Sequence, residues 1–283
     1  GYTEEAVEAV TKYVELAPDH PNPHDSYAEI MQWEGDTETA LAHYRKAVEL
    51  RPSYVAGYQG IAEAEWLLGN HDEARVALEQ AMAHQTTEAA QLNTQRAIAA
   101  TYMMQGKRKE ADAGFAAVAA TAEAGGFEWI ARNAHYQAAA NDAINGKGES
   151  VTAHLAKAAE LGGEGTAGQY IWGASTYAIA GDLETARTML ASLKSMESAS
   201  ESDGMRVAAA HVMIEEGDVE GAMSILKEMD QTNTMARALM ARSYKAMKDG
   251  DKAKKLQASV VGDPTMNFYN AGQTMAAAQV RKM

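Results

Sequence analysis

A glycine that returns at a nearly constant interval constrains the fold of this chain most. Successive glycines lie 34, 37, 40, 35 and 36 residues apart, and together they cover most of the 283 residues: Gly35, Gly69, Gly106, Gly146, Gly181 and Gly217. A fixed period of roughly 20–50 residues is typical of repeat architectures, in which each unit buries its apolar face against its neighbours. The sequence therefore predicts a stack of at least six similar units.

The residues around each glycine repeat with it. An alanine stands seven positions before it: Ala28, Ala62, Ala99, Ala139, Ala174 and Ala210. A small residue stands five positions after it: Ala40, Ala74, Ala111, Val151, Ala186 and Ala222. A larger one stands nine positions after it: Tyr44, Leu78, Phe115, Leu155, Leu190 and Leu226. Glycine permits a tight turn between two helices, small side chains let the helices approach closely, and the +5 and +9 positions lie on one helical stripe. Each unit is predicted to be a helix-turn-helix.

Composition favours an all-α fold. Only five prolines occur in the chain, and alanine, the strongest helix former, is present in nearly every segment. No stretch rich in β-branched and aromatic residues alternates with a period of two, as a strand would require. Two of the five prolines fit the repeat. Pro18 and Pro52 lie 34 residues apart, and each is expected to follow the second helix of a unit.

This pattern resembles the tetratricopeptide repeat, most closely in Asn22–Pro52 and Tyr54–Met82. The resemblance implies a right-handed superhelical solenoid of about seven helix-turn-helix repeats with a C-terminal capping helix. The last repeat is drawn from Thr234 to Val260, and its turn glycine is expected to have moved to Gly250. A final helix is expected over Thr265–Arg281, with Phe268, Ala271, Met275 and Ala278 on its apolar face.

We expect one continuous solenoid over residues 1–283, although a division into two arrays near residue 125 stays open. Residues 1–18 read as the second helix of a truncated repeat, 21–262 as about seven repeats, and 263–283 as the capping helix. Gly1 lies 34 positions before Gly35, so we expect further residues to precede it in the natural protein. A targeting segment would lie among them, and both the bacterial cytoplasm and an exported location stay open.

Partner-binding residues follow from the resemblance, because the first helix of each tetratricopeptide unit lines a concave groove. The positions that point into that groove give these candidates: Asn22, Asp25, Glu29, Gln32, Gln59, Glu63, Trp66, Asn93, Arg96, Met103 and Tyr136. Trp66 is the expected anchor, since aromatic side chains dominate protein-binding energetics; the alternative is a partly buried packing residue. The carboxylates of Asp25, Glu29 and Glu63 favour a partner with basic residues, and their alternative is a solvated helix face.

Charge and composition exclude several other functions. The formal net charge is −14, and residues 1–100 carry 17 acidic against 6 basic residues, which disfavours nucleic acid. There is no run of about 18 apolar residues to enter a membrane. The chain has no cysteine. His20 and His24 are four residues apart, as two metal ligands on one helix would be, but Pro21 and Pro23 lie between them, so His20 is expected to lie before the helix begins. We predict no metal, no cofactor and no catalytic site.

The leading functional interpretation is a non-catalytic scaffold that binds a protein or peptide in its groove. Basic residues concentrate in residues 235–258, so self-assembly between this region and the acidic first part of another copy is an alternative. The regulatory arm of an enzyme whose catalytic part lies outside this chain is a further alternative. Fold analogy alone does not choose among them.

Overall fold

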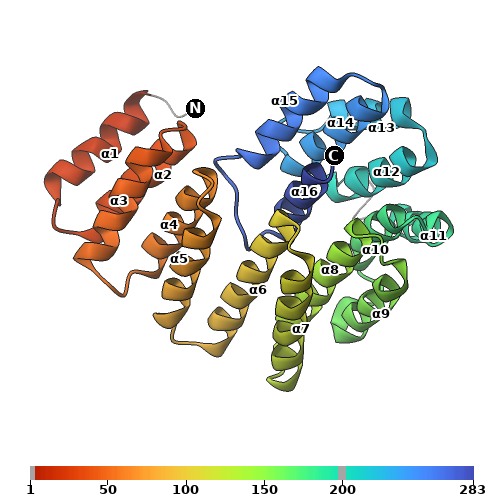
Figure 1. Ribbon diagram of the computed structural model, residues 1–283, viewed down its shortest axis with the longest axis horizontal. Coiled ribbons are helices and arrows are strands. Elements are labelled where there is room, and N and C mark those ends of the chain that lie inside the picture. The colour runs from red at the N-terminus through yellow and green to blue at the C-terminus, as the bar shows by residue number, and fades with distance from the viewer. Residues whose placement is uncertain (1–3, 197–201) are drawn as a thin grey trace. The chain divides into compact units, whose positions relative to one another are not determined.

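The computed structural model describes residues 4–196 and 202–283, and within these ranges the chain contains helices and no strand (Figure 1). The helices are α1 Glu4–Leu16, α2 Pro21–Trp33, α3 Thr37–Leu50, α4 Val55–Leu67, α5 His71–Ala83, α6 Glu88–Gln105, α7 Arg108–Ala124, α8 Glu128–Ile144, α9 Gly148–Ala158, α10 Ala167–Ala180, α11 Leu183–Lys194, α12 Asp203–Glu216, α13 Val219–Lys227, α14 Thr234–Ala246, α15 Gly250–Val261 and α16 Ala271–Arg281. A short π-helical turn, Ala159–Gly163, extends α9.

Helices α2 to α15 follow one another as seven helix-turn-helix pairs, beginning with α2 and α3 and ending with α14 and α15. The predicted all-α repeat fold is therefore confirmed. Helix α1 precedes the first pair and packs against α2, as expected for the second helix of an earlier unit. Gly1, from which that truncated unit was drawn, lies outside the described residues.

The recurring glycines end the first helix of each pair, as predicted. All six have positive φ, between 68° and 89°, a conformation that a residue with a Cβ rarely adopts. At Gly35 the backbone N–H bonds to the carbonyl of Gln32, and the next N–H, of Asp36, bonds to that of Met31. This pair of backbone hydrogen bonds is the Schellman motif, and the same pair is present at the other five glycines.

The seventh turn corrects one expectation from the sequence. Lys248, not Gly250, takes the left-handed position there, with φ 63°. The N–H groups of Lys248 and Asp249 bond to the carbonyls of Lys245 and Tyr244, as in the other turns. Gly250 instead is the first residue of α15. The hydrogen-bonded turn is thus kept at the repeat position even without a glycine to occupy it.

Small residues lie where the helices cross. The six alanines before the turn glycines are at most 1% exposed, and the six small residues after them are fully buried. In α4, Gly60 lies against Tyr44 of α3, and a Cβ on Gly60 would lie only 2.3 Å from the Tyr44 ring. The two helices therefore approach more closely here than an alanine would allow.

Changing Gly60 to alanine is expected to destabilise the protein by roughly 1–2 kcal/mol. The gain in helix propensity, about 1 kcal/mol, is outweighed by the overpacking of a buried ring that has little room to move. Gly168→Ala is the matched control, since its Cβ would meet only the Thr166 hydroxyl at 3.8 Å. Urea unfolding should show a lower midpoint for Gly60→Ala and an equal or higher one for Gly168→Ala. Equal midpoints for the two variants would contradict the packing argument.

The described residues form two compact units. The first comprises residues 1–98 together with 262–269, and the second comprises 99–261 together with 270–283. Helix α6 contributes residues to both units. The boundary lies closer to the N-terminus than the division near residue 125 left open above, and the single continuous solenoid stays a prediction.

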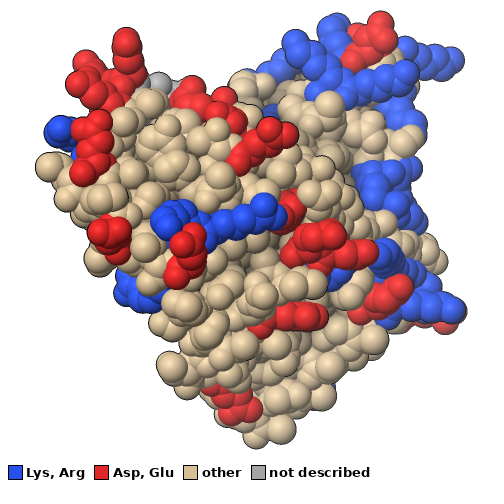
Figure 2. All heavy atoms as spheres, turned by 60° about the vertical axis from the view of Figure 1, so that its left-hand side comes forward, with Lys and Arg blue, Asp and Glu red and all other residues tan. Residues whose placement is uncertain are grey.

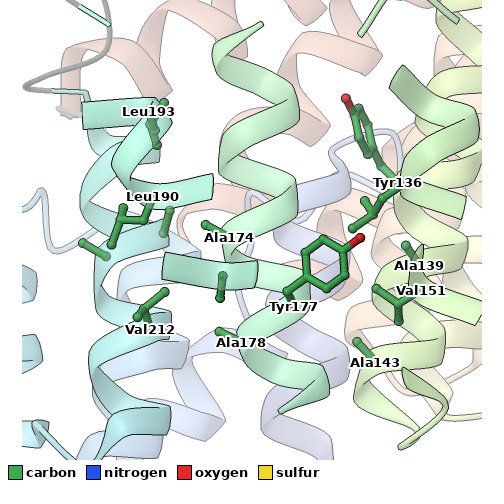
Figure 3. Close-up of a cluster of buried hydrophobic side chains, with 14 of the residues drawn as sticks. Tyr136, Ala139, Ala143, Val151, Ala174, Tyr177, Ala178, Leu190, Leu193 and Val212 are labelled. Atoms are coloured by element: carbon green, nitrogen blue, oxygen red, sulfur yellow. The ribbon is translucent and has the colours of Figure 1, made fainter. Parts of the chain in front are cut away.

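Tyrosine, leucine, valine and alanine side chains fill the core of the second unit. Figure 3 shows part of this cluster, in which Tyr136 and Ala139 of α8 lie opposite Tyr177 and Ala174 of α10. Leu190 and Leu193 of α11 and Val212 of α12 continue the same cluster. Leu155 and Leu190, the larger residues of their units, thus pack among the alanines of this cluster, as the repeat pattern predicts.

The last part of the chain differs from the single capping helix expected over Thr265–Arg281. Helix α16 begins only at Ala271, because the Asn270 side chain accepts hydrogen bonds from the backbone N–H groups of Gly272 and Gln273 and so caps it. It packs against α8, α14 and α15 in the second unit, so it contacts first helices of two separated pairs instead of covering only the last pair. Residues 262–269 are not helical and belong to the first unit.

Candidate binding groove

The tail segment, residues 262–269, lies along the first helices of the first unit. Figure 1 shows it as the blue connection between α15 and α16. Gln32 of α2 donates from Nε2 to the Pro264 carbonyl oxygen at 3.1 Å, and Arg96 of α6 donates from Nη2 to the Tyr269 carbonyl oxygen at 3.0 Å. The surface that these helices present, called the inner face below, therefore already holds a non-helical stretch of backbone.

Tyr269 is fixed by side chains from two of these helices. Its hydroxyl accepts a hydrogen bond from Gln59 Nε2 at 2.9 Å and lies 3.0 Å from the Thr94 hydroxyl. Burial raises the pKa of Tyr269, and it lowers the pKa of Arg96 to about 10. The Arg96 guanidinium also donates to Asn93 Oδ1 at 2.9 Å. Four of the predicted groove positions thus contact the tail segment or support a residue that does.

Trp66, the predicted anchor, is buried against the protein itself. It is 6% exposed, and its ring lies 5.5 Å from that of Phe268 in an edge-to-face arrangement and 4.1 Å from that of His71. Phe268 is 1% exposed. Trp66 was expected to contact a partner, but its aromatic neighbour is Phe268 of the chain's own tail segment.

An open pocket of about 250 Å³ lies beside the tail segment on the same face. Five of the eleven candidate residues line it: Asp25, Glu29, Gln32, Gln59 and Glu63. Trp33, Tyr44 and residues 264–267 complete its wall. This is called the carboxylate pocket below, since three of its lining groups are carboxyls from two neighbouring first helices.

The carboxyl groups of this pocket are held in an unfavourable environment. The pKa of Glu63 is raised to about 8, mainly by burial and also by the nearby carboxylates of Glu29 and Asp25, although a hydrogen bond from Gln32 acts in the opposite direction. Burial also raises the pKa of Asp25, against the effect of the Tyr54 hydroxyl that donates to its Oδ2 at 2.9 Å. Burial and the nearby Asp25 carboxylate also raise the pKa of Glu29. The pocket therefore disfavours its own negative charge.

The other candidates lie elsewhere. Asn22 is exposed and accepts a hydrogen bond from Arg51 at 3.3 Å. Met103 and Tyr136 belong to the second unit, where Met103 is buried and Tyr136 stacks on Trp172 at 5.5 Å. Asp25, Glu29, Gln32, Gln59 and Glu63 thus line one pocket of the first unit, and Asn22 lies outside its lining. Trp33 and Tyr44 were missed as lining residues, because Trp33 directly follows Gln32 and Tyr44 belongs to a second helix.

A second opening lies within the second unit. Its volume is about 410 Å³, and its apolar lining includes Trp172, Val207 and Met275. Ser175 also lines it, and the buried Ser175 hydroxyl has no hydrogen-bond partner. Among the described residues of its lining Asp203 is the only charged one, whereas the carboxylate pocket has three carboxyl groups.

Charge at the surface does not by itself locate a site. On the face drawn in Figure 2, red acidic and blue basic side chains lie beside one another in several places, with uncharged areas between these groups. No described helix is both long and apolar enough to cross a membrane. Among residues 4–196 and 202–283, no three His, Asp or Glu side chains are arranged to hold a metal ion. His20 instead caps α2, and His24 contacts the Pro18 carbonyl and His43.

Comparison with known proteins finds a family match for part of the chain. The tetratricopeptide repeat family matches residues 34–98. A tetratricopeptide repeat protein from Parabacteroides merdae ATCC 43184 is similar over 97% of this chain and 99% of its own, at 12% identity and a TM-score of 0.54. YrrB, a TPR protein with an unusual peptide-binding site, is similar over 78% of this chain and 100% of its own, at 20% identity and a TM-score of 0.43. No curated protein sequence matches the chain.

The resemblance found in the sequence is thereby confirmed. The family match covers residues 34–98, which include the first two turn glycines, Gly35 and Gly69. The solved structure with the TM-score of 0.54 supports the same fold over nearly the whole chain.

Proposed function

We propose that this protein is a non-catalytic scaffold, and that the inner face of its first unit binds an extended segment of a partner protein. The observation that carries the proposal is the tail segment. Gln32 and Arg96 donate to backbone carbonyls of that segment, and Trp66 packs on its Phe268. A surface that recognises main-chain carbonyls and one aromatic side chain has the properties needed to hold a peptide.

The carboxylate pocket gives a partner access to this face while the tail segment is in place. It is open to solvent beside residues 264–267, and Ala56 of α4 is exposed at its wall. A partner segment entering here would lie next to the tail segment and bury uncharged area on α2 and α4. The general role in protein interaction agrees with the fold, and the location on this face is our proposal.

Partner capture tests the location with a steric block. Ala56→Arg adds a large side chain at the exposed wall of the pocket, and Ala42→Arg adds the same group to an exposed position of α3. A partner recovered with the native protein and with Ala42→Arg is expected to be lost with Ala56→Arg. A photo-reactive residue at position 56, and not one at 42, should cross-link to that partner. Equal recovery and cross-linking at both positions would disprove binding at this face.

A further inference from the structure

Three carboxyl groups share one small pocket without a cation beside them. Asp25, Glu29 and Glu63 all line the carboxylate pocket, and within the described ranges none of them forms an ion pair with a lysine or arginine. Asp25 is bonded to the Tyr54 hydroxyl, and Glu63 to Gln32. Clustered carboxylates that repel one another and lack a counterion cost folding free energy, so a functional reason for them is expected.

Gln32 supplies an independent observation in the same pocket. It is 2% exposed, and its Nε2 donates to the Pro264 carbonyl oxygen. Its side-chain Oε1 is buried and has no hydrogen-bond partner. An unsatisfied buried acceptor costs folding free energy, and the described residues provide no donor for it. The carboxylates of Asp25, Glu29 and Glu63 and the unpaired Gln32 Oε1 are acceptors, so what is missing in the pocket is a donor with positive charge.

Aromatic rings complete the wall. Tyr44 lies at the base of the pocket with 3% of its surface exposed, and Trp33 lies at its rim with 44% exposed. Aromatic faces attract cations and also accommodate the methylene stem of a long side chain. A pocket with carboxylates at its polar end and aromatic rings beside them therefore matches a ligand with a charged head on an apolar stem.

We propose that the carboxylate pocket binds the primary ammonium group of a lysine side chain presented by the partner. This assignment rests on the proposed function, since the lysine belongs to the bound segment. An ammonium group donates three hydrogen bonds from one compact charge, which suits separate acceptors on α2 and α4. Arginine is less suitable, because its planar guanidinium pairs best with one carboxylate in a bidentate arrangement.

Binding should release a proton from the pocket. Glu63 faces Asp25 and Glu29 on α2, Tyr44 on α3 and Tyr269 in the tail segment, and with a pKa of about 8 it is mostly protonated at pH 7. A bound ammonium favours the ionised carboxylate and lowers that pKa. Affinity should therefore rise as the pH increases from 6 to 8, by up to about tenfold per pH unit.

Nuclear magnetic resonance titrations of the full chain test the proposal. The probe is acetyl-Gly-Gly-Lys-Gly-Gly-amide, and the controls carry norleucine, Nε-acetyl-lysine or arginine at the central position. We expect saturable shifts of the Gln32 side-chain amide with the lysine peptide. The norleucine and acetyl-lysine peptides should bind at least tenfold more weakly, and the arginine peptide more weakly than lysine. Equal binding of norleucine, or tighter binding of arginine, would overturn the assignment.

Charge-neutral variants then identify the groups. Glu63→Gln and Glu29→Gln should each weaken the lysine peptide about tenfold and reduce the pH dependence, whereas Glu79→Gln on the exposed surface of α5 should change neither. Glu63→Gln is expected to fold with an equal or higher melting temperature, because it removes a disfavoured charge. Loss of lysine-peptide binding in Glu79→Gln as well would count against the pocket. If the lysine peptide does not bind but Ala56→Arg still removes the partner, the scaffold proposal stands and the lysine assignment falls.

Discussion

Phe268→Ala is expected to release the tail segment from the first unit. Phe268 is 1% exposed and pairs edge-to-face with Trp66, so its truncation leaves a cavity under residues 262–269. Removing a buried phenylalanine side chain costs about 3–5 kcal/mol. Because the tail segment is not part of a helix, this cost should appear as local opening before global unfolding. The backbone bonds from Gln32 and Arg96 are expected to be lost with it.

Hydrogen exchange measured by mass spectrometry can follow this opening. Amides of residues 262–269 should exchange at least a hundredfold faster in Phe268→Ala, since every 1.4 kcal/mol is a factor of about ten in an equilibrium. Val261→Ala, at an exposed position just before the segment, is the matched control and should leave exchange unchanged. Unchanged exchange in Phe268→Ala, or equal acceleration in both variants, would show that Phe268 does not anchor the segment.

The repeats could be predicted because their determinants are local. Each turn needs a residue with positive φ, and each helix crossing needs a small one, so glycine and alanine recur with the period of the fold. The carboxylate pocket follows from the same register. Asp25 and Gln59 lie 34 residues apart, as do Glu29 and Glu63, and equivalent positions of neighbouring first helices lie side by side. Sequence alone thus placed five of the pocket's residues together.

The tail segment could not be predicted, because its contacts join residues far apart in the chain. Gln32 and Pro264 are 232 positions apart, and Gln59 and Tyr269 are 210 apart. No periodic pattern signals such pairings. Phe268 also lies in phase with Ala271, Met275 and Ala278, which made residues 265–281 resemble one helix. The structure separates them at Asn270, where a cap begins α16. For the same reason Trp66 was predicted to anchor a partner, whereas in the structure its neighbour is Phe268 of this chain.

Acidification is expected to weaken the docking of α16 in the second unit through His211. This residue is fully buried, its Nδ1 donates to the Val207 carbonyl at 3.1 Å, and its Nε2 accepts from Gln279 of α16 at 3.1 Å. This arrangement requires the neutral imidazole. Burial, together with the nearby charge of Arg242, lowers the pKa of His211 to about 3. Helix α16 is thus held partly by a histidine that must stay uncharged.

The direction of the pH effect follows from the two pKa values. An unfolded histidine has a pKa of about 6.5, so the unfolded chain takes up a proton below this pH while folded His211 does not. Its contribution to stability is complete above pH 6.5 and is lost as the pH falls toward 3, at up to about 1.4 kcal/mol per pH unit. The lowered pKa values of His43 and His154 act in the same direction. The raised pKa of Glu63 has the opposite effect, because acidification protonates this carboxyl group and so favours the folded state.

Because these groups overlap, the test compares stabilities between variants. The free energy of unfolding of the native protein, relative to His211→Gln, should fall by about 3 kcal/mol between pH 6.5 and 4. Glutamine at this position can still bond to Gln279 but does not titrate. His84→Gln, at an exposed site, is the matched control and should show no such difference. A parallel pH dependence in the native protein and His211→Gln would mean that His211 is protonated in the folded state, and the neutral hydrogen bond to α16 would have to be abandoned.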